Sequence, residues 1–261
     1  KSYSAALEEI KTWLSTKVSI IQAKKANTYS LKSSPLIKLT NISVYSLKTQ
    51  VLSDINLEIM TGQRIGIIGK SGSGKSTLLD VITGLIRPSD GSILIANDNI
   101  YLSKDKLISW RSSIAFVPQR VHLRDLSIRD NIIGRFCKDV NEERFKEAVY
   151  IALLDKIIEN LPEKYNYIVG ERGTNLSGGQ CQRIAIASAL YSSKPVLVFD
   201  EATSALDIET ENSFIQRLSH ISYDKTIIMV SHRESSLKFC DKVITLGATG
   251  RIDRIQNSDN L

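Results

Sequence analysis

Short apolar runs alternate with polar segments along most of this chain, and their spacing predicts secondary structure. Apolar and polar residues alternate over 36–46 and 51–59, as they do in half-buried antiparallel strands. The stretch PVLVFDEA (195–202) is instead continuously apolar until its end, which is typical of a strand buried in a parallel sheet. Other short apolar runs predict strands at 64–69, 92–97, 114–119, 225–232 and 242–246.

Helical spacing marks other parts of the chain. STLLDVITGL (76–85) follows a glycine-rich stretch and carries Gly84 near its end, where helices often stop. Residues 120–190 are mostly helical by pattern, and VNEERFKEAVYIALLDKII (140–158) is strongly amphipathic. A strand, a glycine loop, a helix and further apolar strands predict an α/β fold with a mainly parallel sheet. A helical insertion at about 120–190 and an antiparallel sheet around the glycine loop complete the expected architecture.

The first 34 residues have a different pattern. Residues 1–16 place Leu7, Ile10, Trp13 and Leu14 at helical spacing, and residues 17–34 are rich in Lys, Ser and Asn, like a linker. So short a helix is marginal alone and is expected to pack on something. It is either a terminal helix of this domain or the tail of an upstream one. The chain starts at Lys1, so we expect it to be a fragment.

Composition narrows the functional classes only slightly. The chain has 261 residues, of which 42% are hydrophobic and 24% charged, and its net charge is +6. This mildly basic balance suits nucleotides, anionic membranes or nucleic acids. Cys137, Cys181 and Cys240 are far apart and lack metal-ligand spacing, so we interpret them as reduced thiols. No apolar run approaches the roughly 18 residues that cross a bilayer, and no signal peptide is visible.

The stretch GKSGSGKST (69–77) carries the strongest chemical signal. It matches G-x-x-x-x-G-K-[ST] and lies between a predicted strand and a predicted helix, as this phosphate-binding motif requires. Its glycines let successive backbone amides point at phosphate oxygens, and the following helix N-terminus adds partial positive charge. We expect Lys75 to reach the β- and γ-phosphates and Ser76 to bind Mg²⁺. The expected phosphate-binding residues are Gly69, Lys70, Ser71, Gly72, Ser73, Gly74, Lys75, Ser76 and Thr77.

Polar residues end three of the predicted strands. Asp200 is placed to hold Mg²⁺ directly or through water, and the adjacent Glu201 to accept a proton from an attacking water. The alternative is a purely structural role, in which a carboxylate caps the N-terminus of a helix over ATSALD. His232 ends TIIMVSH, where a γ-phosphate contact is plausible. Gln119 follows IAFVP, and its neutral amide is a candidate ligand for metal or water.

Taken in order, these motifs resemble those of the ATP-binding cassette (ABC) family. The likeness covers residues from about 36 to 261. It implies a P-loop NTPase (RecA-like) core with an antiparallel β subdomain and a helical signature subdomain, which makes 35–261 the ATP-binding domain. The matched motifs are GKSGSGKST as Walker A, FVPQ with Gln119 as Q-loop, LSGGQ (176–180) as signature, VLVFDEATSALD as Walker B and D-loop, and VSHR with His232 as switch histidine.

The signature stretch NLSGGQCQR raises the question of why a chain would expose a serine and two glycines before a helix. The resemblance implies that two subunits bind two ATP molecules head to tail, and that each signature caps the γ-phosphate held by the other subunit. Ser177 would donate its hydroxyl and Gly178 and Gly179 their amides, with Gln180 and Asp207 also at the nucleotide. The expected partner is a second copy, or a paralogous cassette.

Other stretches indicate the exporter type. VGERGTNLSGGQ (169–180) and HLRDLSIRDNI (122–132) resemble exporter sequences, and residues 1–16 resemble the end of a last membrane-spanning helix. The resemblance therefore implies a transmembrane domain in the same polypeptide upstream of residues 1–34. The whole would be a half-transporter at the cytoplasmic face of the inner membrane, of which this soluble fragment is the ATPase.

The chain departs from the family pattern at two positions. An aromatic residue in the first strand usually stacks on adenine, and Tyr45 is the nearest one, although the family register favours Ser46. Cys181 stands where the family often has a basic residue. We expect this change to weaken a charge contact in the helix without abolishing hydrolysis.

Two other functional classes compete with export. A cassette ATPase in DNA repair, chromosome handling or translation is compatible with the basic charge, but the chain lacks the long insertions usual in such proteins. A degenerate cassette acting as an interaction module is disfavoured by the intact Glu201 and His232. We expect no nucleic acid partner. The cargo stays open among lipids, lipid-linked oligosaccharides, peptides and drugs, with a preference for lipid or lipid-linked oligosaccharide.

Overall fold

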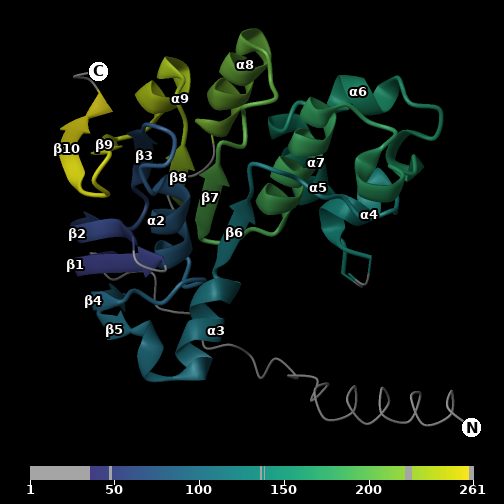
Figure 1. Cartoon of the computed structure of the whole chain (residues 1–261). Coiled ribbons are helices and arrows are strands. Elements are labelled where there is room, and N and C mark those ends of the chain that lie inside the picture. Colours follow the sequence, from purple (N-terminus) through teal and green to yellow (C-terminus); the bar gives the residue numbers. More distant parts are fainter. Residues whose placement is uncertain (1–35, 47–48, 136, 138, 221–224, 259–261) are drawn as a thin grey trace, which may run out of the picture.

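The computed structural model describes residues 36–46, 49–135, 137, 139–220 and 225–258. The elements predicted for residues 1–16 and 17–34 lie outside the described residues. Within the described part, no helix is both long enough and apolar enough to span a membrane. Two sheets and a group of helices make up the fold (Figure 1).

The first sheet is the predicted antiparallel one. Its strand order is β2-β1-β4-β5, so it uses chain from both before and after the glycine loop. In β2, the buried Ile55, Leu57 and Ile59 alternate with exposed residues, which confirms the period-2 pattern. The strands are β1 (Ile37–Ser46), β2 (Thr49–Ile59), β4 (Asp90–Ile95) and β5 (Asp98–Asn99).

The second sheet has the order β10-β9-β3-β8-β7-β6. The strands from β9 to β6 run parallel, and only β10 is antiparallel to its neighbour. Their carboxyl ends therefore lie along one edge, where the loops after them meet. The strands are β3 (Arg64–Gly69), β6 (Ile114–Val117), β7 (Val196–Asp200), β8 (Thr226–Val230), β9 (Lys242–Leu246) and β10 (Ile252–Asn257).

Helices cover both faces of the parallel sheet, and α4 to α7 gather beyond β6, at the opposite end from β10 (Figure 1). The α-helices are α2 (Lys75–Ile82), α3 (Lys104–Ser112), α4 (Ile128–Ile133), α5 (Glu142–Ile151), α6 (Asp155–Glu159), α7 (Gly178–Tyr191), α8 (Ile208–Leu218) and α9 (Glu234–Phe239). Short 3₁₀ turns are η1 (Ile100–Leu102), η2 (Lys164–Asn166) and η3 (Glu171–Gly173).

The amphipathic run 140–158 is broken into α5 and α6, which its pattern did not indicate. Leu153 has φ 57°, its N–H donates to the Tyr150 carbonyl, and the next N–H donates to the Val149 carbonyl. This is the hydrogen-bond pattern of a Schellman stop, which usually needs glycine. Arg183 from α7 also donates to the Leu153 carbonyl at 3.2 Å, so a tertiary contact supports the break. At the predicted stop after α2, by contrast, Gly84 does supply the positive φ.

Alternate residues of the central strands belong to two separate hydrophobic clusters, one on each face of the sheet. In β7, Val196 and Val198 pack with the antiparallel sheet, α2 and α3, whereas Leu197 and Phe199 pack with α5, α7 and α8. Trp110 of α3 is fully buried in the first cluster, and its indole N–H donates to the Ile82 carbonyl at 2.8 Å. This contact joins α3 to the end of α2, the helix that starts at the glycine loop.

Replacing Trp110 with alanine should lower the free energy of unfolding by about 3–5 kcal/mol, because it removes a large buried ring and opens a cavity. Urea unfolding followed by circular dichroism measures the loss. Leu102→Ala is the control, since that side chain is 76% exposed and its truncation should change stability by less than about 0.5 kcal/mol. Equal effects of the two substitutions would show that the packing around Trp110 is wrongly described.

Candidate functional site

The glycine loop joins the end of β3 to the start of α2. Gly72 and Gly74 have φ values of 80° and 96°, a region that residues with a side chain rarely adopt. A Cβ on Gly74 would also lie 2.9 Å from a methyl of Leu52 and 3.0 Å from the Val51 carbonyl of β2. Glycine is therefore required at position 74 for both backbone conformation and space.

Two polar side chains of this loop, those of Ser73 and Lys75, are buried. Lys75 is only 7% exposed, and its Nζ donates to the carbonyls of Gly69 at 2.8 Å and Lys70 at 3.1 Å. The Ser73 hydroxyl is buried without a hydrogen-bond partner among the described residues. A buried, unpaired hydroxyl is costly in isolation. A phosphate oxygen would accept from it, so the loop fits the phosphate group that its sequence predicts.

Asp200 and Glu201 lie at the carboxyl end of β7. Burial raises the pKa of Asp200, while a hydrogen bond from the Ser76 side chain acts in the opposite direction. Glu201 has φ 47°, an unusual conformation for a residue with a side chain, and its N–H donates to the Val230 carbonyl of the neighbouring strand. Turns rather than a helix follow Glu201, so the helix-capping alternative is excluded, and α8 begins only at Ile208.

The ends of three parallel strands bring Gln119, Glu201 and His232 together. The Gln119 amide donates to one Glu201 carboxylate oxygen at 2.6 Å, and His232 Nε2 lies 3.7 Å from the other. Gln119 and His232 are both exposed, so this cluster faces solvent. The sequence predicted a mainly parallel sheet without a strand order, and in the structure β6, β7 and β8 lie side by side.

The predicted metal ligands can be compared with the chemistry of Mg²⁺. The Ser76 hydroxyl and the Asp200 carboxylate share a hydrogen bond, so both hard oxygen donors lie at one point. Mg²⁺ is usually held by one or two such ligands together with substrate phosphates. Burial disfavours the ionised form of Asp200, and a cation there would stabilise that form. These two residues therefore fit the ion. The side-chain amide of Gln119, the third predicted ligand, donates a hydrogen bond to Glu201 instead.

The signature residues build the start of α7. Ser177 caps the helix, its hydroxyl accepting from the Gln180 N–H at 3.3 Å while the Gln180 side chain accepts from the Ser177 N–H at 2.8 Å. Gly178 and Gly179 form the first turn itself, and they differ in their surroundings. A Cβ on Gly179 would lie 2.9 Å from the Ala205 carbonyl, whereas on Gly178 the nearest atom is 3.9 Å away. Gly178 is thus free on its outer side.

This signature turn and the glycine loop occupy different parts of the fold. Helix α7 lies at the β6 end of the sheet, while α2 follows β3, a central strand with two strands between it and β6 (Figure 1). No hydrogen bond joins residues 177–180 to residues 69–77 in the part of the chain that the structure describes. Within one chain, the predicted nucleotide residues therefore form two separated groups.

Tyr45 and Asp207, which the sequence also singled out, both lie at the surface. Tyr45, at the end of β1, is 50% exposed, and its neighbour Val44 pairs with Leu52, which contacts the glycine loop. Asp207 caps α8 by accepting from both the backbone and the hydroxyl of Thr210, and these bonds lower its pKa. Tyr45 and Asp207 thus both leave polar groups at the surface.

Cys181 is buried rather than surface-facing. It is 8% exposed, its Sγ lies 3.7 Å from the Gly173 carbonyl, and burial raises the pKa of the thiol. A Cβ on Gly173 would lie 2.6 Å from that sulfur, so the two residues pack closely. Cys181 thus packs α7 against the GERG turn at residues 170–173. Cys137, Cys181 and Cys240 are all free cysteines.

Sequence reasoning missed Gln182, two residues after the signature. It is buried, and its Oε1 accepts from the Ala205 N–H at 3.1 Å. Its Nε2 lies 3.5 Å from the carbonyls of Gln119 and Glu201 and 3.4 Å from the Ser204 hydroxyl. One side-chain amide therefore contacts both the loop after β6, at Gln119, and the segment after β7, at Glu201, Ser204 and Ala205. The available signal was a polar residue on the buried face of α7.

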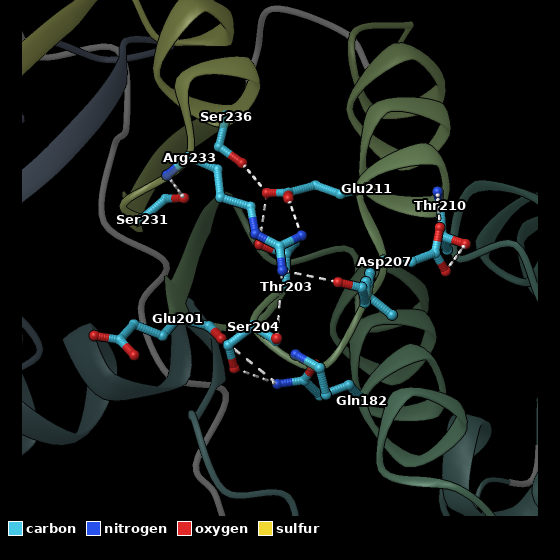
Figure 2. Close-up of polar contacts among 12 residues, drawn as sticks. Gln182, Glu201, Thr203, Ser204, Asp207, Thr210, Glu211, Ser231, Arg233 and Ser236 are labelled. Atoms are coloured by element: carbon cyan, nitrogen blue, oxygen red, sulfur yellow. Dashed lines mark hydrogen bonds and ion pairs between the residues drawn. The ribbon is translucent and has the colours of Figure 1, made fainter.

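Glu211 and Arg233 were missed as well. Glu211 lies on the buried face of α8 with Phe214 and Leu218 and is fully buried. Figure 2 shows its carboxylate meeting the guanidinium of Arg233, the residue after His232. A charged residue on an apolar helical stripe was the available signal.

The different surroundings of the two signature glycines lead to a prediction. Gly179→Ala should lower the free energy of unfolding by about 1–3 kcal/mol, because the new methyl displaces the Ala205 carbonyl. Gly178→Ala should be neutral or raise it by up to about 1 kcal/mol, since alanine is the better helix former. Parallel chemical denaturation of both variants measures the difference, and the reverse order would contradict the packing of α7 on the Ala205 loop.

Comparisons with known proteins identify the family of this chain. The family model described as "ABC transporter" matches residues 52–204. The toxin RTX-III translocation ATP-binding protein of Actinobacillus pleuropneumoniae is 42% identical over 196 residues, which are 75% of this chain and 27% of that protein. The leukotoxin translocation ATP-binding protein LktB of Mannheimia glucosida is 40% identical over 217 residues, 81% of this chain and 30% of that protein.

A solved structure of a bacterial Atm1-family ABC exporter with ATP bound is similar in three dimensions. It aligns with a TM-score of 0.78 and 32% identity, covering 86% of this chain and 39% of that one. The chain spans less than a third of the two curated relatives it matches. The chain therefore belongs to the ABC transporter family and forms an ATP-binding domain of the kind found in ABC exporters.

Proposed function

We propose that this chain is the ATP-hydrolysing motor domain of an ABC exporter. The observation that carries the proposal is the cluster of Gln119, Glu201 and His232 at the sheet edge where the glycine loop also begins. A carboxylate, a neutral amide and an imidazole beside a phosphate-binding loop suit hydrolysis of a phosphoanhydride better than simple nucleotide storage.

Each residue has a role that follows from its surroundings. The loop amides and Lys75 bind and orient the phosphates of ATP. The Lys75 ammonium then donates to phosphate oxygens in place of the Gly69 and Lys70 carbonyls. Glu201 accepts a proton from the attacking water, which Gln119 and His232 orient. Ser76 and Asp200 would hold Mg²⁺, which would supply positive charge to offset that of the phosphates.

The second group of residues supports a dimer. Ser177 and the outer side of Gly178 are exposed at the positive end of α7 and are separated from the glycine loop of the same chain. In a head-to-tail pair, the signature of each subunit closes over the phosphates bound by the other. Gln180 holds the cap, and Asp207 and the Tyr45 ring lie at the nucleotide. The partner is a second copy or a paralogous cassette.

The relatives support a larger protein at a membrane. Because this chain spans less than a third of their length, the remainder has room for a transmembrane domain of the same polypeptide. The domain then works at the cytoplasmic face of the membrane. Relatives named for toxin and leukotoxin translocation favour a toxin cargo over the lipid or lipid-linked oligosaccharide preferred from sequence. They also disfavour an ATPase acting on nucleic acid or ribosomes.

Replacing Glu201 with glutamine should lower the rate of ATP hydrolysis by about 100-fold or more, because glutamine cannot accept the proton. Binding of ATP should stay within about threefold of the parent, since the glycine loop is unchanged. Phosphate release and fluorescence of a labelled ATP analogue measure the two properties separately. Chelation of Mg²⁺ with EDTA should abolish turnover in the parent. A Glu201→Gln variant with parental turnover would remove Glu201 from the proposed chemistry.

A further inference from the structure

A buried carboxylate lies behind the cluster of Gln119, Glu201 and His232. The Glu211 side chain is 1% exposed, and three donors from different segments satisfy it. One oxygen accepts from the hydroxyls of Thr203, at 2.8 Å, and Ser236, at 2.5 Å. The other accepts from Nη1 of Arg233 at 2.5 Å. Glu211 therefore joins α8, α9, the turn after β7 and the loop after β8 (Figure 2).

The guanidinium of Arg233 has a second set of contacts. Its Nη2 donates to the Leu206 carbonyl at 2.8 Å and lies 3.5 Å from the Ser204 carbonyl. Its backbone N–H donates to the Ser231 hydroxyl at 3.1 Å, which fixes the chain on either side of His232. One planar group thus bridges a buried anion and the backbone of residues 203–206, a task for which a single ammonium has the wrong shape.

Residues 203–206 are also held from the opposite side. Gln182 of α7 accepts from the Ala205 N–H at 3.1 Å, and its Nε2 lies 3.4 Å from the Ser204 hydroxyl. The segment begins directly after Ala202 and therefore follows Glu201 closely. Gln182 thus contacts this segment on one side and Arg233 on the other, directly after the Glu201 turn (Figure 2).

We propose that Arg233, anchored by Glu211, is a positioning residue that fixes Glu201 and His232 relative to each other through residues 203–206. The proposal rests on the function proposed above. A buried ion pair commonly adds little stability over well-packed apolar residues, so packing alone does not explain why charge is present here. The pair joins the segments that follow β7 and β8, and among the described residues neither side chain forms a hydrogen bond with the glycine loop.

The test compares variants of the complete chain for turnover, nucleotide affinity and folding. Arg233→Lys keeps the charge but cannot hold both Glu211 and the Leu206 carbonyl. Its kcat should fall about tenfold to hundredfold, as displaced reacting groups do. The dissociation constant of a fluorescent ATP analogue should stay within twofold. Lys238→Gln is the matched control, because it removes an exposed ion pair with Glu234 on the same helix α9 and should keep parental kcat.

A second variant separates positioning from folding. Glu211→Leu combined with Arg233→Met replaces the ion pair by apolar residues, which should preserve a cooperative thermal transition well above the assay temperature. It should bind the ATP analogue normally and still show the tenfold or greater loss of kcat. Parental kcat in this double variant, or a loss of kcat that only accompanies a loss of nucleotide affinity, would overturn the proposal.

ATP hydrolysis by the unsubstituted chain separates a failure of the positioning proposal from a failure of the proposed motor function. If the parent hydrolyses ATP and Glu201→Gln does not, the motor function stands, and the Arg233 variants test positioning alone. If the parent itself shows no turnover at any chain concentration, the proposed function fails first, and with it the positioning role.

Discussion

The parallel alignment of β3, β8, β7 and β6 is the constraint on which the site depends. Parallel strands place their carboxyl ends at one edge, so the loops that follow them converge whatever their separation in sequence. The glycine loop, Gln119, Glu201 and His232 are each reached by leaving one of these strands. The strands can lie side by side because both faces of the sheet are apolar and covered.

Convergence of loops at one edge brings polar backbone into a crowded space. Their amides and carbonyls require partners where no sheet or helix supplies them. Gln182 and Arg233 satisfy several of these groups at once, and Glu211 provides the charge that holds Arg233 in place. The segment that these contacts fix on two sides directly follows Glu201, which has a left-handed conformation. Polar side chains buried behind the site therefore determine its geometry.

The sequence predicted what depends on periodicity and on short motifs. The strands other than β5 and β10, the glycine loop and the candidate roles of Gln119, Glu201 and His232 follow from apolar runs that end in polar residues. It did not predict the helix stop at Leu153, because a leucine there adopts a conformation expected of glycine and relies on Arg183. It also missed Gln182 and the Glu211–Arg233 pair, whose partners are distant in sequence. The packing of Cys181 against Gly173 depended likewise on a tertiary contact.

The central claim is that the exposed signature turn becomes a phosphate site only with a second subunit. Light scattering of Glu201→Gln, with and without Mg²⁺ and ATP, tests it most directly, because slow hydrolysis preserves the complex. We predict the mass of one chain without nucleotide and of two chains with it. Adding Gly178→Arg, which leaves the Ser177 cap intact but covers the outer side of the turn, should return the mass to one chain. A single-chain mass for Glu201→Gln at saturating ATP and high protein concentration, or a dimer unaffected by Gly178→Arg, would contradict the account.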